Sequence, residues 1–364
     1  MMNPTVAYLM PTGRCNLHCE GCYATLEHAG RTSAKLELSF AEYRSVIDEL
    51  VTMGVRTFDI SGGEPLMYGR IAELCEYIRQ HDGTEIMLVT NGTRERLGVL
   101  QRLSKVVNRL VISLDAPEPA LHDHMRGMAG AFQLSLRTLR RARALRFQEV
   151  AINQLLCVSN YASVGAMLRL CSDEHVDRLS LLMFRDVSEN AVMPQMVPPL
   201  KIQQQTWSEV ARLLGAVSHP RIVNLVVPAF LRPEAKSFHA SLPLAIRRRV
   251  MLLHPNLRGA SAFRSAIVIK PFGTVTGDTA MWNDELFEIG NAREGLRDIW
   301  VRGSTSWRER IAARERDLSS AGPCQGCARW HVCRGGCVAA ATHQAGRSAS
   351  HDKTCDAFRA AGAF

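Results

Sequence analysis

The chain of 364 residues is long enough for one large α/β domain and a smaller one, and its apolar content of 46% can build both cores. The net charge of +9 could favour a polyanion, but lysine and arginine are spread along the chain, and the densest run, at 137–146, indicates one solvated helix face. Nucleic-acid binding is therefore disfavoured. No stretch approaches the roughly 20 apolar residues of a membrane span, and the run at 6–10 is too short for a signal peptide. We expect a cytoplasmic protein with no membrane partner.

Strand-like apolar runs recur in a regular order, and each is followed by a helical pattern. The strands are expected at 6–10, 57–60, 86–90, 109–114, 149–158 and 178–184. The helices are expected at 40–53, 70–80, 94–104, 131–145, 163–174 and 202–217. Ser39 and Glu42 form a capping box at the start of the first helix. Six strand–helix units imply parallel strands joined by right-handed crossovers, in a partial rather than a closed barrel.

The pattern loosens after about residue 218. A further strand at 222–227 leads into a linker with a bridging helix, and a hairpin pattern follows at 266–278. We therefore expect three parts: a barrel over 1–230, a linking segment over 231–262 and a smaller domain over 263–364.

Four unusual segments lie where predicted strands end. They are the cysteine triplet in "RCNLHCEGCY", "SGGEP" at 61–65, "TNGT" at 90–93 and "SLDAP" at 113–117. In barrels of parallel strands the reacting groups lie on loops at the carboxyl ends of the strands. The shared placement of these segments predicts a functional site on one rim.

The eleven cysteines fall into two groups and three single residues. Cys75, Cys157 and Cys171 lie in apolar runs and are expected to be small buried side chains. Disulfides are not expected in a cytoplasmic protein, so the two groups indicate metal ligands or catalytic groups. The first group is Cys15, Cys19 and Cys22, and the second is Cys324, Cys327, Cys333, Cys337 and Cys355.

A local triplet of cysteines is compatible with two kinds of metal site. Structural zinc takes four ligands, so the triplet would need a distant fourth ligand such as His18 or His28. A four-iron cluster held by three thiolates keeps one iron open for a substrate or cofactor.

The C-x3-C-x2-C spacing after the first strand, followed by Gly62, Gly63, Glu64 and Pro65 after the second, resembles the radical S-adenosylmethionine (SAM) superfamily over roughly residues 5–200. The resemblance implies that a 4Fe–4S cluster binds SAM through its open iron. An electron from the reduced cluster then breaks the bond from sulfur to the 5′ carbon, and the resulting 5′-deoxyadenosyl radical removes a hydrogen atom from the substrate.

The resemblance also implies roles for the other rim residues. The backbone at Gly62 and Gly63 would approach the SAM ammonium closely, and the presence of the triplet favours this role over that of a tight turn. Ser113 and Asp115 resemble the fourth-strand motif near the SAM carboxylate or ribose, and Arg126 follows at a common spacing or forms a surface ion pair. Asn153 and Asn160 either bind the ribose or cap a turn. Many relatives carry an aromatic residue before the third cysteine, where this chain has Gly21 and Tyr23 follows instead.

The second cysteine group resembles the SPASM extension of radical SAM enzymes over about 263–358. Supporting patterns are "KPFG" at 270–273 and "IGNAREGLRDIW" at 289–300, which resemble that module's hairpin glycine and a short helix ending in Trp300. The fold implied is α/β: a partial (βα)6 barrel of radical SAM type followed by a small α+β SPASM-like cluster-binding domain.

In that module the outer auxiliary cluster would be held by Cys324, Cys327, Cys333 and Cys355. The inner cluster uses two upstream cysteines, but no cysteine lies between 172 and 323, and Asp278 stands five positions after Gly273. We therefore expect one auxiliary 4Fe–4S cluster and no second one, with Cys337 and Asp278 as candidate ligands of any further cluster. The alternative for the whole group is a zinc knuckle.

The resemblance favours a peptide or protein side chain as substrate, modified by oxidation or cross-linking. The alternatives are an oxidoreductase, epimerase or decarboxylase acting on a small molecule or a porphyrin-type precursor. A non-enzymatic zinc scaffold or nucleic-acid-binding protein is a further alternative. The implied partners are a one-electron donor such as flavodoxin or ferredoxin and, for a peptide substrate, a separate carrier protein. The segment at 181–199 stands where a lid would be expected.

Overall fold

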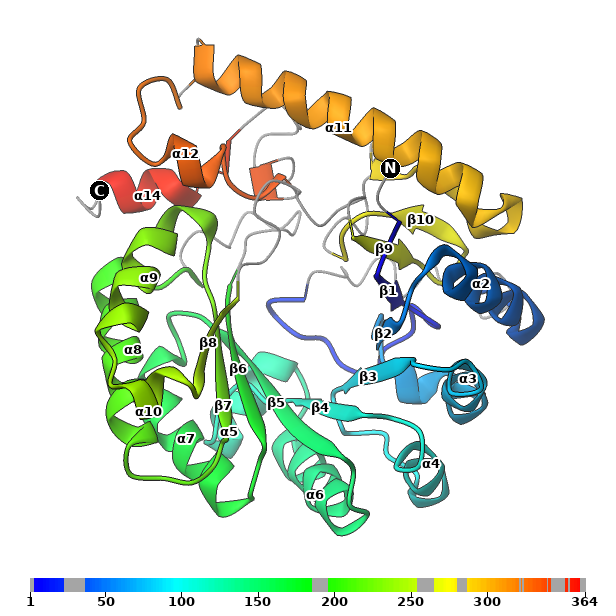
Figure 1. The fold of residues 1–364 in the computed structure, drawn as a ribbon. Coiled ribbons are helices and arrows are strands. Elements are labelled where there is room, and N and C mark those ends of the chain that lie inside the picture. The colour runs from blue at the N-terminus through cyan, green and yellow to red at the C-terminus, as the bar shows by residue number, and fades with distance from the viewer. Residues whose placement is uncertain are drawn as a thin grey trace.

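The computed structural model describes residues 3–22, 37–184, 196–253, 265–279, 287–320, 322, 324–338, 340–341, 351–352 and 354–360. In these residues one sheet of 11 strands runs in the order β11-β10-β9-β1-β2-β3-β4-β5-β6-β7-β8. The sheet curves into an open crescent with helices along its outer face (Figure 1).

The parallel strands and the outer helices follow the predicted alternation. The strands are β1 Val6–Leu9, β2 Thr57–Ile60, β3 Glu85–Thr90, β4 Arg109–Ser113, β5 Glu149–Leu156, β6 Arg178–Met183, β7 Ile222–Val226 and β8 Val250–Leu253. The helices are α2 Phe40–Met53, α3 Ile71–Ile78, α4 Leu97–Leu103, α5 Pro119–Arg126, α6 Ala131–Ala144, α7 Val164–Asp173, α8 Leu200–Leu214, α9 Arg232–Ser241 and α10 Leu244–Arg247. Six strands and six helices confirm the sequence pattern to within a few residues at each end, whereas α5 and β8 were not predicted.

Helix α2 has strong local sequence signals at its start, at its end and along its buried face. Ser39 Oγ accepts a hydrogen bond from Glu42 N, and the Glu42 carboxylate accepts one from Ser39 N at 2.6 Å, which confirms the capping box. The helix ends at Gly54, whose φ of 105° lies in the left-handed region. Its predicted apolar stripe is buried against the sheet and consists of Tyr43, Val46, Ile47 and Leu50.

The late hairpin extends the barrel's own sheet. β9 (Ala266–Ile269) pairs with β10 (Thr274–Thr276) in antiparallel fashion, as predicted, and β10 pairs with β11 (Gly290–Asn291). β9 also pairs with β1 in parallel register, Val6 opposite Ala266. The sheet therefore continues across the residue range in which the sequence placed the linking segment and the second domain.

The prediction of a short helix ending in Trp300 was wrong. Helix α11 begins at Leu296, just after Gly295, and runs for 25 residues to Ser320, with Trp300 in its second turn. The helix continues because no proline interrupts it and because Trp307 and Leu318 extend its buried stripe. α11 spans the open side of the crescent and leads to the short helices α12 (Trp330–Cys333) and α14 (Thr354–Ala360) (Figure 1).

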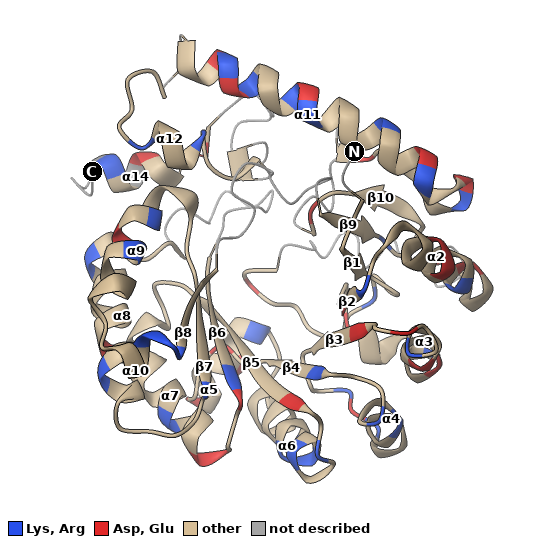
Figure 2. Cartoon of the chain, in the orientation of Figure 1, with Lys and Arg blue, Asp and Glu red and all other residues tan. Residues whose placement is uncertain are grey.

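Charge is distributed over the helices without separation by sign. Acidic and basic segments alternate along α11 and the outer helices (Figure 2). Ion pairs such as Arg102–Glu76 and Arg140–Glu174 join neighbouring helices. Among the described helices, none is long and apolar enough to cross a membrane.

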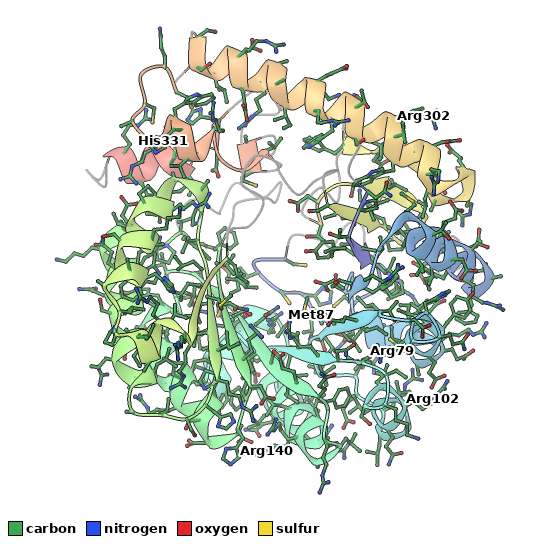
Figure 3. All side chains as sticks on the ribbon, viewed as in Figure 1. Arg79, Met87, Arg102, Arg140, Arg302 and His331 are labelled. Atoms are coloured by element: carbon green, nitrogen blue, oxygen red, sulfur yellow. The ribbon has the colours of Figure 1, made fainter. Side chains whose placement is uncertain are left out.

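Inward-facing residues of the strands form layers inside the crescent. Met87 on β3 points into this interior, whereas Arg79, Arg102 and Arg140 lie on the outer helices (Figure 3). At the amino ends of the strands, the Glu149 carboxylate accepts hydrogen bonds from Arg109 (2.7 and 3.0 Å) and Arg178 (2.5 Å). This ion network forms one end of the interior, and the predicted rim loops form the other.

Candidate functional site

The segment that follows β1, residues 10–22, is called the cysteine loop here, and it is anchored by the "SGGEP" loop after β2. Gly63 N donates a hydrogen bond to Thr12 O at 2.9 Å, and Glu64 N donates one to Arg14 O at 2.8 Å. The two loops therefore form a continuous ladder just before Cys15.

The two glycines in that ladder allow backbone to approach backbone. A Cβ atom on Gly63 would lie 2.2 Å from Arg14 O, and one on Gly62 would lie 2.7 Å from Thr12 O. Gly62 also has a φ of 114°, which side chains rarely adopt. These close approaches are made to the cysteine loop itself, which explains both glycines without a ligand.

Glu64 fixes the "TNGT" loop that follows β3. Its buried carboxylate accepts hydrogen bonds from Thr90 Oγ1 (2.6 Å), Asn91 N (2.8 Å) and Leu66 N (2.9 Å). Burial raises the pKa of Glu64, and these three hydrogen bonds oppose the increase. The Asn91 side chain is thereby directed at the cysteine loop, with Nδ2 3.9 Å from Cys15 Sγ and 3.3 Å from Asn16 Oδ1.

The end of α5 supports the other half of the cysteine loop. His18 N and Glu20 N donate hydrogen bonds to Arg126 O (3.3 Å) and Met125 O (3.1 Å). The Arg126 side chain turns inward, where its Nη1 lies 3.7 Å from Cys19 Sγ and its Nε lies 2.8 Å from Asp115 Oδ2. Arg126 is therefore a largely buried cation between a carboxylate and a thiol, and not the surface ion pair that the sequence left open.

Asp115 and Asn160 hold the ends of β4 and β5 together. Asp115 Oδ1 accepts a hydrogen bond from Leu155 N at 3.0 Å. The fully buried Asn160 donates to Asp115 O and Leu155 O, both at 2.7 Å, and accepts from Cys157 N. Of the two roles considered for Asn160, the structure shows the turn-capping one.

A cavity of about 310 Å³ opens beside the cysteine loop. Six residues singled out in the sequence line it: Cys19, Cys22, Ser113, Asp115, Arg126 and Asn153. Cys15, Gly62, Gly63 and Glu64 are not among its lining residues. The sequence reasoning missed Tyr8 and Asp59, which also line the cavity. Their signal was a polar residue at an inward-facing position of an otherwise apolar strand.

The aromatic position before the third cysteine has a structural counterpart. A Cβ atom on Gly21 would lie 3.0 Å from Leu155 Cδ2 and 3.3 Å from the ring of Phe184, just after β6. Phe184 therefore occupies the space that a larger residue at position 21 would need. Tyr23, His28 and most of the expected lid, residues 185–195, lie outside the described residues.

The sulfur atoms of Cys15, Cys19 and Cys22 do not all lie within 4.8 Å of one another. Tetrahedral zinc with Zn–S bonds of about 2.3 Å brings its sulfurs within about 4 Å of one another. Among the described residues, one group of three candidate ligands lies within 4.8 Å, namely His351, Cys355 and Asp356. It contains none of Cys15, Cys19 and Cys22, and His18 is exposed. The wider spacing fits a cluster of several metal atoms.

Two of the late cysteines belong to the short helices: Cys333 ends α12 and Cys355 lies in α14. Cys324, Cys333 and Cys355 are each 7% exposed or less, and burial raises the pKa of all three thiols, that of Cys333 to about 12. Neighbouring thiols contribute further, since Cys327 raises the pKa of Cys324 and Cys333 raises that of Cys355. Thiols that disfavour each other's ionisation need a bound cation to become thiolates.

Arg314 of α11 supplies one positive charge beside this group. Its side chain is buried and donates hydrogen bonds to Arg334 O (3.1 Å) and Gly335 O (2.7 Å) in the turn between Cys333 and Cys337. Burial lowers the pKa of Arg314, and the thiols of Cys337, Cys324 and Cys333 oppose that shift. A cation held at this place fits an anionic centre.

Cys337 and Asp278 each have a neighbouring polar group. Cys337 N donates a hydrogen bond to the buried Asp352 carboxylate at 3.3 Å. Asp278 follows β10, is 4% exposed, and accepts a hydrogen bond from Thr276 Oγ1 at its own carbonyl. The predicted structural cysteines, Cys75, Cys157 and Cys171, are fully buried.

A rim of cysteine, glycine and polar loops on a partial parallel barrel, joined to a second cysteine group, defines an enzyme of the radical SAM class. Residues 9–169 match the family model of the Radical SAM superfamily. The match covers the first strands and the rim loops, and together with the relatives below it supports a radical SAM enzyme with a C-terminal auxiliary domain. The family implies a 4Fe–4S cluster and SAM as cofactors.

Two kinds of relatives share sequence with the chain. The mycofactocin maturase MftC of Mycobacterium tuberculosis is 28% identical over 333 residues, which cover 90% of this chain and 77% of the relative. The AdoMet-dependent heme synthase of Methanosarcina barkeri is 35% identical over 129 residues, which cover 34% of this chain and 35% of the relative.

Two solved structures share the fold. Streptococcus suis SuiB bound to S-adenosylmethionine is 16% identical, with a TM-score of 0.64 over 97% of this chain and 77% of SuiB. Native anSMEcpe with bound AdoMet is 14% identical, with a TM-score of 0.67 over 97% of this chain and 95% of that protein. These similarities confirm the α/β fold that the sequence predicted.

Proposed function

We propose that this radical SAM enzyme modifies a side chain of a peptide or protein. The observation that carries the proposal is that Cys19 and Cys22 open onto a cavity at the carboxyl ends of the strands, where SAM and a substrate side chain would meet. The similarity to a maturase over 90% of the chain supports the peptide class, because it includes the auxiliary domain as well as the barrel.

In this proposal Cys15, Cys19 and Cys22 hold the SAM-binding 4Fe–4S cluster. When bound, the cluster and SAM supply a 5′-deoxyadenosyl radical that takes a hydrogen atom from the substrate. The role of the protein is to orient the three sulfur atoms and to stabilise their negative charge as thiolates. Asn91 Nδ2 and Arg126 Nη1 point at Cys15 Sγ and Cys19 Sγ, and donors directed at a thiolate stabilise its negative charge.

The proposed SAM contacts lie along the cavity wall. Ser113, Asp115, Arg126 and Asn153 face the space beside Cys19 and Cys22, at the ends of β4 and β5 and at the end of α5. Gly62, Gly63 and Glu64 act through the backbone ladder that holds the cysteine loop, and we assign the backbone carbonyls of the "SGGEP" loop to the SAM ammonium.

We further propose two clusters in total. Cys324, Cys327, Cys333 and Cys355 are the ligands of the auxiliary 4Fe–4S cluster, and four thiolates leave no open iron, which suits electron transfer or structural support. Cys337 and Asp278 are not assigned a cluster. An external one-electron donor such as flavodoxin or ferredoxin and a separate peptide carrier protein complete the set of proposed partners.

The test uses anaerobically reconstituted full-length protein with SAM and dithionite. We expect brown protein that forms 5′-deoxyadenosine, and deuterium transfer into 5′-deoxyadenosine from a library of side-chain-deuterated peptides. Transfer from a small molecule or a porphyrin precursor, with none from peptides, would overturn the substrate class. The partial similarity to the heme synthase is the reason to include that arm.

A further inference from the structure

Asp59 is a buried carboxyl group at the inner end of the candidate cavity. It lies on β2, where its register partners are Tyr8 on β1 and Met87 on β3. Met87 points into the interior of the crescent (Figure 3), and both Tyr8 and Asp59 line the cavity. The side chain of Asp59 therefore faces the same space as Cys19 and Cys22, from one layer below the rim.

This carboxylate differs from Glu64 and Asp115, the two other buried acidic groups of the site, and from Glu20, which also lines the cavity but is exposed. Glu64 accepts three hydrogen bonds, and Asp115 accepts one from Leu155 N and lies 2.8 Å from Arg126 Nε. Asp59 is 8% exposed, and its Oδ1 atom has no hydrogen-bond partner among the described residues. A buried acceptor without a donor costs about 1–3 kcal/mol, so such a group is expected to meet a donor at some stage of function.

Arg109, the cation that acts on Asp59, is already bound to another residue. Arg109 forms two hydrogen bonds with the Glu149 carboxylate and contacts Met87 Sδ at 3.7 Å. Burial raises the pKa of Asp59 to about 7, and Arg109 lowers it only in part. The protein therefore leaves the charge of Asp59 uncompensated on the side that faces the cavity.

Much of the remaining wall of the cavity is apolar and is formed by Val89, Leu155, Leu182, Met125 and Met196. Polar residues line it as well: Glu20, Ser61, Ser113, Asn153 and Thr279. An occupant that fills this space must combine apolar surface with a polar end that reaches Asp59.

We propose that Asp59 is the hydrogen-bond acceptor of a substrate site that takes an apolar group ending in a donor, namely an amine, an amide N–H or a hydroxyl. A substrate group ending in a carboxylate is excluded from this site. The proposal rests on the proposed function for its statement that the substrate enters this cavity. Asp59 itself acts as a binding residue.

The test compares ligands that share one ring and differ in the polar end. Reconstituted protein with SAM and no reductant is titrated at pH 8 with benzylamine, benzyl alcohol and phenylacetate, and binding is followed by saturation-transfer NMR. We expect benzylamine to bind most tightly and phenylacetate to bind least. In Asp59→Asn the affinity for benzylamine should fall about tenfold or more, because a charge-assisted hydrogen bond is lost. The matched control, Asp82→Asn, changes an exposed aspartate and should leave all three affinities unchanged.

Two outcomes would overturn the proposal: phenylacetate binding the unaltered protein as tightly as benzylamine, or Asp59→Asn keeping full affinity for benzylamine. The ligand series on unaltered protein decides the matter if the variant does not load iron. Formation of 5′-deoxyadenosine is measured in the same preparations. Its absence would count against the proposed function, whereas its presence with the wrong ligand order would count against Asp59 alone.

Discussion

Arg126 lies 2.8 Å from the carboxylate of Asp115, and the same guanidinium lies 3.7 Å from Cys19 Sγ. The pair connects the end of α5 to the end of β4 directly beside the cysteine loop. Since both side chains are largely buried, neither charge can be satisfied by water if the other is removed.

We therefore expect Arg126→Met to lower the free energy of unfolding by about 3–5 kcal/mol and to reduce iron retention. Thermal unfolding and iron content of reconstituted protein measure the two effects. The double variant Asp115→Asn/Arg126→Met removes the stranded carboxylate and should recover part of the lost stability. If the double variant were less stable than Arg126→Met, the loss would not come from an uncompensated charge.

Gly63→Ala tests the ladder between the "SGGEP" loop and the cysteine loop. The new Cβ atom would lie 2.2 Å from Arg14 O, so one backbone must move, at a cost of about 1–3 kcal/mol. We expect lower iron content and weaker SAM binding by equilibrium dialysis. Gly69→Ala is the matched control, because a Cβ atom on Gly69 meets nothing within 4 Å. Equal iron content in both variants would contradict the role of the ladder.

Asp59 should make stability depend on pH. Burial raises its pKa from 3.8 to about 7, so the folded protein holds this proton more tightly than the unfolded chain does. The decrease in the free energy of unfolding that Asp59 causes is absent below pH 3.8, grows as the pH rises towards 7 and is constant above that. Asp59→Asn should thus be more stable than the unaltered protein at pH 8. The advantage should shrink by about 1 kcal/mol at pH 6. Denaturant unfolding at both pH values measures it, and a pH-independent difference would refute this origin.

The cysteine assignment predicts how much iron each variant holds. Two 4Fe–4S clusters give about eight irons per chain in reconstituted protein. Cys333→Ser should lose about four of them, whereas Cys337→Ser should lose none, because only Cys333 belongs to the proposed ligand set. Iron and sulfide analysis with Mössbauer spectroscopy makes the count. A value near twelve irons in the unaltered protein would show that a third cluster is present.

Arg314 should raise the midpoint potential of the auxiliary cluster. Replacing it with glutamine removes a buried positive charge beside the thiols of Cys324 and Cys333 and should favour the oxidised, less negative form of the cluster. We expect a more negative midpoint potential in an EPR-monitored redox titration. Arg308→Gln, an exposed change on the same helix, is the control. An unchanged potential in Arg314→Gln would contradict the assignment.

The predictable part of the molecule is the part with local signals. Helix α2 is an example, because its capping box at Ser39 and Glu42 and its apolar stripe can both be recognised within 14 residues of sequence. The structure shows both as predicted. The four rim segments were also expected together, because parallel strands present their carboxyl ends on one side. Their mutual contacts, such as Glu64 with Asn91, follow from that placement.

The unpredicted part depends on contacts between distant segments. The length of α11 depends on where Trp307 and Leu318 are buried, which the sequence around Trp300 does not reveal. The sequence shows Asp59 only as one residue of the strand "TFDI". That its Oδ1 atom has no hydrogen-bond donor can be seen only once β1 and β3 are placed on either side of β2. The role of Gly62 and Gly63 was likewise hidden, since the backbone that they approach belongs to another loop.

The pairing of β9 with β1 constrains the order in which the chain can fold during synthesis. β1 directly precedes the cysteine loop, and its outer edge stays unpaired until residues 265–269 have left the ribosome, because Thr5 bonds to a residue 260 positions later. Such a long separation makes this contact late, and a bare strand edge meanwhile invites pairing with other chains. The strand that leads into the first cysteine group therefore gains its second neighbour only after residues 265–269 have been synthesised.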